Sequence, residues 1–185
     1  MTASAWSRSV PLVIGTILAL GSPLQAQELT TVLVVRHAEK AWEDGDPPLS
    51  DVGWERAGAL LRIADESGVS VLYATQYQRS SQTLEPISES LGLEILVHDA
   101  RDSEGLAKRI LTEHSGSVVL VSGHSNTVPE IVVALGAPEP PPIDDAEYDN
   151  LYIVSVGPGA GEATVLRLNY GRPAGEPNQP AEVQP

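Results

Sequence analysis

Residues 32–40 read VLVVRHAEK, so four apolar residues are followed directly by an arginine and a histidine. Three of the four are β-branched, a pattern typical of a strand that is buried on both faces in a parallel sheet. Arg36 and His37 therefore lie where a buried strand ends. Because buried polar groups cost free energy unless they are paired, these two side chains need a partner, and an anion suits them best. The stretch predicts a parallel sheet with an anion site at its edge.

Short apolar runs alternate with longer amphipathic stretches along the rest of the chain. We expect strands over residues 31–35, 69–74, 94–97, 117–122, 151–156 and 164–168. Between the earlier strands we expect helices over residues 51–67, 79–91, 103–114 and 127–135. Ser50 is placed to cap the first helix and Gly68 to end it. The alternation predicts an α/β protein, a three-layer α/β/α sandwich with a mostly parallel sheet.

Pro86 conflicts with the second of these helices. A proline inside a helix removes a backbone donor and clashes with the preceding turn, at a cost of about 3 kcal/mol. We therefore expect this helix to be kinked or to begin later than Arg79.

The first 26 residues resemble a secretory signal peptide. Arg8 precedes an apolar stretch over residues 10–20, which is followed by Gly21-Ser22-Pro23 and by the small residue Ala26, near which we expect cleavage. The apolar stretch is shorter than the roughly 20 residues that span a bilayer, so a retained membrane anchor is the weaker alternative. We expect a periplasmic or secreted protein with one domain over residues 27–170 and a disordered Pro- and Gly-rich tail over residues 171–185.

The chain is strongly acidic, with 11 Lys and Arg residues against 25 Asp and Glu residues and a formal net charge of −14. This charge disfavours nucleic acids and anionic membrane surfaces as partners. Any anion site must then be a local positive pocket. The chain has no cysteine, which excludes disulfides, thiol catalysis and thiolate metal sites.

Three of the expected strands lead to basic side chains. The first ends at Arg36 and His37, the second leads to Arg79, and the fourth leads to His124. If these strands are parallel, their carboxyl ends share one edge of the sheet, where open α/β folds bind ligands. The two arginines provide paired donors for an oxyanion, and the helix after His124 begins with free amides. Phosphate is the anion that uses all of these groups at once.

A histidine beside two arginines can act as a nucleophile toward phosphorus. The role requires one ring nitrogen to be neutral and the other to be held by a hydrogen bond. His37 is placed for that role, and a protonated His124 would stabilise charge on the phosphoryl group during its transfer. The sequence leaves open which histidine has which role. It also leaves open a module that binds phosphate or a sugar phosphate without catalysis.

Four motifs resemble those of the histidine phosphatase superfamily, the group with phosphoglycerate mutase-like folds. In order they are RHAEK (residues 36–40), LSDVGWERA (49–57), YATQYQRSSQT (73–83) and GHS (123–125). The resemblance extends over about residues 30–168. It implies a phosphoric monoester hydrolase that works through a phosphohistidine at His37, without a metal or other cofactor. It also implies that Arg36 and Arg79 hold the phosphate and that His124 is the second catalytic histidine.

The chain departs from the family pattern at two points. Ala38 stands where the common motif has glycine, so the turn there must not require a positive φ. Only 44 residues lie between Arg79 and His124. The long insertion of the mutase branch, which carries its general-acid glutamate, is therefore missing, and this disfavours mutase activity.

The general acid cannot be transferred from the family and must be sought in the chain itself. Asp99 is the first choice because it follows a strand that ends at the presumed active edge, and Asp102 and Glu39 are alternatives. A good leaving group, such as that of phosphohistidine, needs no acid. We expect an exported phosphatase that acts on a small phosphorylated substrate, with a phosphohistidine protein phosphatase as the alternative inside the enzyme class.

Overall fold

The computed structural model describes residues 29–157 and 163–173. The strands are β1 (Thr30–Arg36), β2 (Val71–Thr75), β3 (Ile95–His98), β4 (Val118–Gly123), β5 (Asn150–Val156) and β6 (Thr164–Asn169). The helices are α1 (Asp51–Ser67), α2 (Gln78–Leu91), α3 (Ser103–Glu113) and α4 (Thr127–Ala134). All of the expected elements are present, with ends within two residues of those expected. The expected signal peptide lies outside the described residues.

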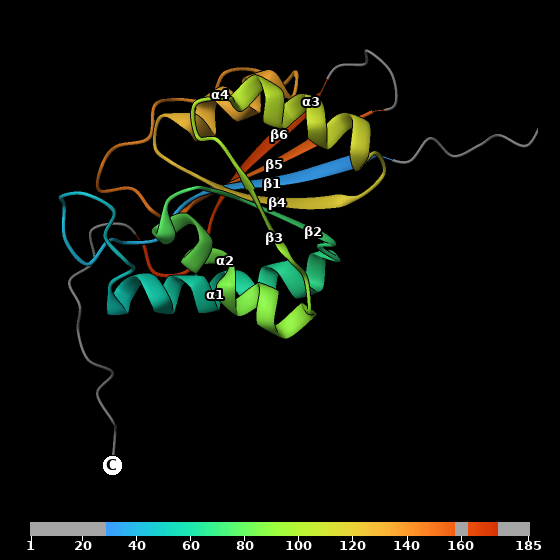
Figure 1. Cartoon of the computed structure of the whole chain (residues 1–185). Helices are drawn as coiled ribbons and strands as arrows, with labels where there is room; N and C mark the ends of the chain where they lie inside the picture. Colours follow the sequence, from blue (N-terminus) through green and yellow to red (C-terminus); the bar gives the residue numbers. More distant parts are fainter. Residues whose placement is uncertain (1–28, 158–162, 174–185) are drawn as a thin grey trace, which may run out of the picture.

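The sheet has six strands in the order β3-β2-β4-β1-β5-β6. β1 to β4 run parallel to one another, whereas β5 and β6 pair antiparallel at one side. In Figure 1, α3 and α4 cover one face of the sheet, and α1 and α2 cover the other. The expected three-layer α/β/α sandwich with a mostly parallel sheet is confirmed.

β1 is buried on both faces, as its apolar run predicts. Val32 and Val34 belong to the hydrophobic cluster that includes residues of α3 and α4, and Leu33 and Val35 belong to the cluster that includes residues of α1 and α2. Successive side chains of a strand point to opposite faces, so four consecutive apolar residues supply both clusters. None of the four exposes more than 1% of its surface. Arg36 and His37 therefore lie at the end of a strand in the interior of the sheet.

The expected caps of α1 are confirmed. Ser50 accepts a hydrogen bond from the Gly53 amide at 3.1 Å, and Gly68 ends the helix with a left-handed φ of 70°. A Cβ at position 53 would meet the backbone carbonyl of Glu39, so this first turn packs directly on the chain that follows β1. The start of α1 is thus tied to the segment that carries His37.

α2 begins at Gln78 and continues through Pro86 to Leu91, so the expectation of a later start is wrong. Leu84 and Ile87, on either side of the proline in sequence, are fully buried against the sheet. Burial of such side chains stabilises by about 1.5 to 3 kcal/mol each, which offsets the lost backbone hydrogen bond. Packing has therefore overridden the local preference.

The beginning of the expected tail is held against α1. Arg56 donates from Nη2 to the carbonyl oxygen of Arg172 at 2.9 Å, and Arg172 donates from Nη2 to Glu55 at 2.9 Å. Residues 171–173 are therefore part of the folded domain. Residues 174–185, which make up the rest of the expected tail, lie outside the described residues.

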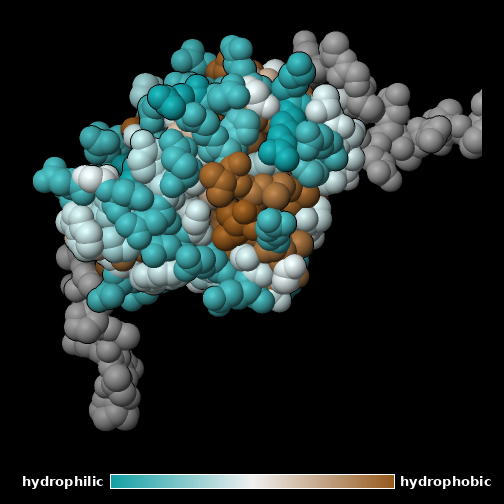
Figure 2. All heavy atoms as spheres, viewed as in Figure 1, coloured by the Kyte–Doolittle hydropathy of each residue, from teal (hydrophilic) through white to brown (hydrophobic). Residues whose placement is uncertain are grey.

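The surface over β3 is apolar. β3 is the strand at one edge of the sheet, and the side chain of Val97 is 58% exposed there. Figure 2 shows a patch of apolar residues over this strand, surrounded by hydrophilic ones. Within residues 29–157 and 163–173, no helix is long and apolar enough to cross a membrane.

Candidate active site

The carboxyl ends of β1, β4 and β2 meet at one edge of the sheet. Arg36 is paired in register with Gly123, and one strand further Ser122 is paired with Ala74. The amide of His37 donates to the Gly123 carbonyl at 2.9 Å, which continues the ladder one residue beyond the strand. The residues that follow these strands are thereby placed side by side, as the expected parallel order requires.

The ring of His37 is held in a single neutral tautomer. Nδ1 lies 2.8 Å from the carbonyl oxygen of Ala38, which can only accept, so Nδ1 carries the proton. Nε2 accepts a hydrogen bond from Nε of Arg79 at 3.1 Å, and its lone pair therefore faces the arginine. Burial, helped by the charges of Arg79 and Arg36 and by His124, lowers the pKa of His37 to about 3. At neutral pH Nε2 is therefore unprotonated.

The turn after His37 is held by Thr83 of α2. The Ala38 amide donates to Thr83 Oγ1 at 2.9 Å, and this hydroxyl donates to the carbonyl of Arg79 at 2.8 Å. One side chain thus connects the backbones of the two motifs. In the described part of the chain, every residue with a positive φ is a glycine, so Ala38 meets the expectation for its turn.

His124 lies next to His37, with ring centroids 5.2 Å apart. Its Nε2 is 2.9 Å from Thr75 Oγ1, and its amide donates to Thr127 Oγ1 at 2.9 Å. Burial first, and then the charges of Arg79 and Arg36, lower the pKa of His124 to about 4. A bound dianion would offset the two arginines, so it would favour the protonated imidazole that charge stabilisation requires.

Arg36 is buried and held by backbone carbonyls far along the chain. Its Nη1 donates to the carbonyl oxygens of Asp144, Asp145 and Glu147 at 2.9, 2.9 and 3.0 Å. Its guanidinium lies 4.0 Å from the ring centre of Tyr148. Its buried Nε has no hydrogen-bond partner among the described residues. The orientation of this arginine is therefore set by the protein, while one of its donors stays open to a ligand.

Arg79 connects the histidines to a loop that the sequence analysis did not single out. Its Nη1 donates to Asp46 at 3.2 Å, and its guanidinium lies 4.5 Å from the ring centre of Tyr77. The ring of Tyr77 also contacts His124 edge to face, with centroids 5.1 Å apart. Tyr77 stands between two quoted motif residues and could have been noted. Asp46 and Tyr148 lie outside the quoted motifs, and nothing in the sequence around them indicates a place in the site.

The structure gives no support to the carboxylates considered as general acids. Asp99 is exposed and pairs with Arg101 at 3.1 Å, and in the described part of the chain it makes no hydrogen bond or ion pair with Arg36, Arg79 or either histidine of the cluster. Glu39 forms a two-pronged ion pair with the buried Arg56, with its shortest contact at 2.7 Å. Asp102 caps α3 by accepting from the Gly105 amide.

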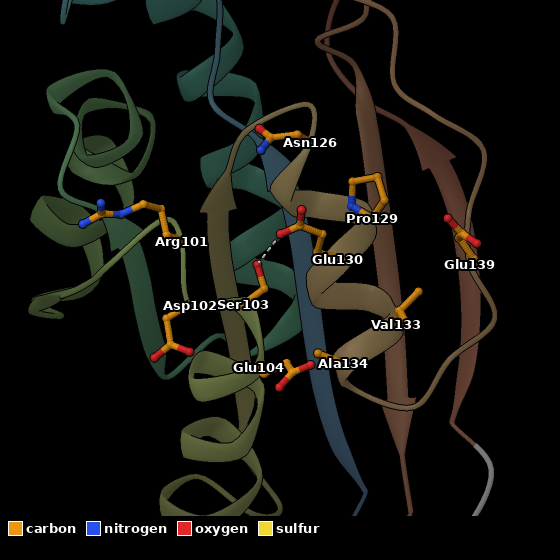
Figure 3. Close-up of a pocket in the computed structure, with 10 residues that line it drawn as sticks. All are labelled: Arg101, Asp102, Ser103, Glu104, Asn126, Pro129, Glu130, Val133, Ala134 and Glu139. Carbon is orange, nitrogen blue, oxygen red and sulfur yellow. Dashed lines mark hydrogen bonds between the residues drawn. The ribbon is translucent and has the colours of Figure 1, made fainter.

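A groove of about 780 Å³ lies beside α3 and α4, away from the two histidines. Figure 3 shows its lining, in which Ser103 donates to Glu130 at 2.9 Å. Asp102, Glu104, Glu130 and Glu139 make it acidic, with Arg101 as the basic lining residue. This lining repels an anion, whereas the basic side chains at the sheet edge would attract one. Among the described residues no group of three or more His, Asp or Glu side chains could hold a metal ion.

Fold and site together define an α/β protein with two histidines and two arginines at the carboxyl edge of a parallel sheet. Residues 32–102 match the sequence profile of the histidine phosphatase superfamily (branch 1). Over this segment, which includes Arg36, His37 and Arg79, the chain is similar to that superfamily. His124 lies beyond the matched segment, and its position beside His37 comes from the tertiary structure.

Solved structures with similar folds include the protein histidine phosphatase SixA complexed with tungstate, at 19% identity and a TM-score of 0.60, covering 75% of this chain and 96% of SixA. A putative phosphohistidine phosphatase SixA from Agrobacterium tumefaciens has 17% identity, a TM-score of 0.56, and coverage of 78% and 99%. Mycobacterial glucosyl-3-phosphoglycerate phosphatase has 14% identity, a TM-score of 0.54, and coverage of 69% and 90%. These similarities concern the fold. No curated protein matches the chain in sequence.

Proposed function

We propose that this protein is a phosphatase that hydrolyses small phosphomonoesters through a phosphohistidine at His37. The observation that carries the proposal is the fixed tautomer of His37. A backbone carbonyl holds Nδ1, and the unprotonated Nε2 faces Arg79. A nucleophile needs an unprotonated lone pair at neutral pH, and the lowered pKa of His37 keeps Nε2 unprotonated.

The arginines and the second histidine supply the positive charge for transfer. Arg79 and the open Nε donor of Arg36 bind the phosphate oxygens. Nε2 of His37 attacks phosphorus, and the bond to the leaving oxygen breaks. His124, protonated beside the dianion, stabilises charge on the phosphoryl oxygens. Water then attacks phosphorus, the N–P bond breaks, and phosphate leaves. We propose that no metal or other cofactor takes part.

A second candidate is a phosphatase that acts on phosphohistidine in a protein. The similarity in fold to the protein histidine phosphatase SixA, almost all of which is covered by this chain, supports it. We rank it second because we also propose export, on the basis of Arg8, the apolar stretch at residues 10–20 and the small residue Ala26. An exported enzyme does not meet cytoplasmic phosphoproteins.

Activity and the covalent intermediate test the proposal together. The purified protein should release phosphate from p-nitrophenyl phosphate in the presence of a chelator, and acid quench should trap an acid-labile phosphoenzyme. His37→Ala should abolish both signals. His98→Ala is the matched control because His98 bonds to Asp102 at 2.9 Å, outside the cluster. Phosphate release that survives His37→Ala contradicts the mechanism, and binding of phosphate without any phosphoenzyme points to a non-catalytic module.

Export has its own test. The full chain, expressed with a C-terminal tag in a Gram-negative host, should be recovered from the periplasm with its mass shortened by cleavage near Ala26. Recovery of the unshortened chain in the cytosol would overturn export and restore cytoplasmic phosphoproteins as substrates.

A further inference from the structure

The loop after the nucleophile places a carboxylate against the phosphate-binding arginine. Asp46 accepts a hydrogen bond from Nη1 of Arg79 at 3.2 Å, on the same guanidinium whose Nε bonds to His37. Its charge also acts on His124, where it opposes the effect of the arginines on the pKa. Asp46 is thus within electrostatic reach of His124 and in direct contact with Arg79, which itself bonds to His37.

The position of Asp46 is set by the start of α2. Its two carboxylate oxygens accept from the amide of Gln78, each at 3.2 Å, and the side-chain amide of Gln78 donates to its backbone carbonyl. The loop itself is closed by a hydrogen bond from the Ala41 amide to the Pro48 carbonyl at 2.9 Å. α2 has no capping bond from the side chain before it, so Asp46 takes that place. The carboxylate is therefore fixed next to Arg79.

We propose that Asp46 is the general acid that protonates the leaving group and the general base that activates water. The proposal rests on the phosphatase function proposed above and extends it to esters of poorly acidic alcohols. Asp46 combines contact with the cluster and access to solvent, because its side chain is 43% exposed. Asp145 is a weaker candidate, since its side chain is 99% exposed and its Oδ1 is as far as 4.0 Å from Arg36 Nη2.

Asp46 takes the proton that an acid needs from solvent when the substrate binds. In the empty site, Arg79 is shared between Asp46 and His37. A phosphate dianion that binds to Arg79 neutralises the positive charge of the guanidinium. It also places negative charge beside the carboxylate of Asp46, which favours the protonated form of Asp46.

The proton balance closes over two steps. As Nε2 of His37 bonds to phosphorus and the ester P–O bond breaks, the proton of Asp46 moves to the departing oxygen, which leaves as an alcohol. Water then attacks phosphorus, Asp46 accepts a proton from this water, and the N–P bond breaks to release phosphate. Neutral His37 and protonated Asp46 are restored.

Leaving-group dependence separates this role from simple capping of α2. Asp46→Asn keeps acceptors for Gln78 and Arg79 but has no acidic proton. For an alkyl ester such as glycerol phosphate, kcat/KM should fall by about 100-fold, the lower range of general acid catalysis. For p-nitrophenyl phosphate, whose leaving group needs no proton, kcat/KM should change little. The variant should also show a burst of nitrophenol and accumulate phosphoenzyme, because hydrolysis of the intermediate lacks its base.

Asp44→Asn is the matched control, because Asp44 is an exposed aspartate of the same loop. It should behave like the unchanged protein with both substrates. Equal loss of kcat/KM on both substrates in Asp46→Asn, or no loss on either, would overturn the acid role. Such a result leaves the phosphohistidine mechanism intact if the phosphoenzyme still forms. Absence of phosphoenzyme in the unchanged protein contradicts the proposed function itself.

Discussion

Arg79 donates a hydrogen bond from Nε to Nε2 of His37 across 3.1 Å. The nitrogen proposed to attack phosphorus is therefore already paired with the side chain proposed to bind phosphate. The bond fixes the direction of the lone pair and keeps Nε2 unprotonated in the empty site. Because Nε of Arg79 lies on this lone pair, the guanidinium must turn to the phosphate oxygens before Nε2 can attack phosphorus, while the ring of His37 keeps its orientation.

Arg79→Lys should reduce kcat/KM for p-nitrophenyl phosphate by about 100-fold although the charge is kept, because an ammonium does not reproduce the planar fork of donors. Binding of inorganic phosphate, measured by calorimetry, should weaken in parallel. Arg109→Lys is the control, because Arg109 pairs with Glu113 on the surface of α3. Equal activity of the two lysine variants would contradict the assigned role of Arg79.

Folding stability should decrease as the pH falls below about 6.5, the unfolded pKa of histidine. The folded pKa values of His37 and His124 are about 3 and about 4, so between these values and the unfolded value only the unfolded chain takes up the protons. Linkage gives a loss of about 1.4 kcal/mol per pH unit for each histidine once the pH is well below the unfolded pKa.

Urea unfolding at pH 7.0, 6.0 and 5.0 measures this slope, above the range in which most carboxylates titrate. His37→Asn should flatten this slope relative to the unchanged protein. A slope that is the same in the variant and in the unchanged protein would show that His37 does not keep a lowered pKa.

Thr83→Val should destabilise the protein by about 1 to 3 kcal/mol, because the buried amide of Ala38 loses its acceptor. The bond from the Thr83 hydroxyl to the carbonyl of Arg79 is lost as well. Activity should fall as well, since both motifs lose the atom that joins them. Thr83→Ser retains the hydroxyl and should restore activity and most of the stability. A serine variant as impaired as the valine variant would indicate that the methyl group, not the hydroxyl, matters.

Glu39→Ala should lower the free energy of unfolding by about 3 kcal/mol, because it leaves the guanidinium of Arg56 buried without its carboxylate. The Arg56 side chain is 2% exposed, and that of Glu39 is 20% exposed. Per folded molecule, the activity on glycerol phosphate should remain, since we propose Asp46 and not Glu39 as the acid. Glu43→Ala removes an exposed carboxylate of the neighbouring loop and should leave the unfolding curve unchanged. Loss of turnover in folded Glu39→Ala would return Glu39 to the candidate acids.

Periodicity and turn residues were sufficient to predict the strands and helices, because both are local properties of the chain. The helix over Asp51–Ser67 agrees with the prediction at both ends, where Ser50 and Gly68 supply the caps. Pro86 shows the limit of local reasoning. Its cost is a local property, but the burial of Leu84 and Ile87 that offsets it depends on a sheet assembled from distant segments.

By itself, the sequence determined that Arg36, His37, Arg79 and His124 would gather at one edge, because parallel strands place their carboxyl ends together. Only the tertiary structure decided how these groups are held. The carbonyls that orient Arg36 come from residues more than 100 positions away, and Asp46 reaches Arg79 from a loop 33 positions earlier. Such contacts follow from how irregular segments close over the sheet, and no repeating pattern in the chain encodes that closure. The gathering of these four residues at one edge follows from the parallel order of the strands, whereas the hydrogen bonds that hold them depend on the loops.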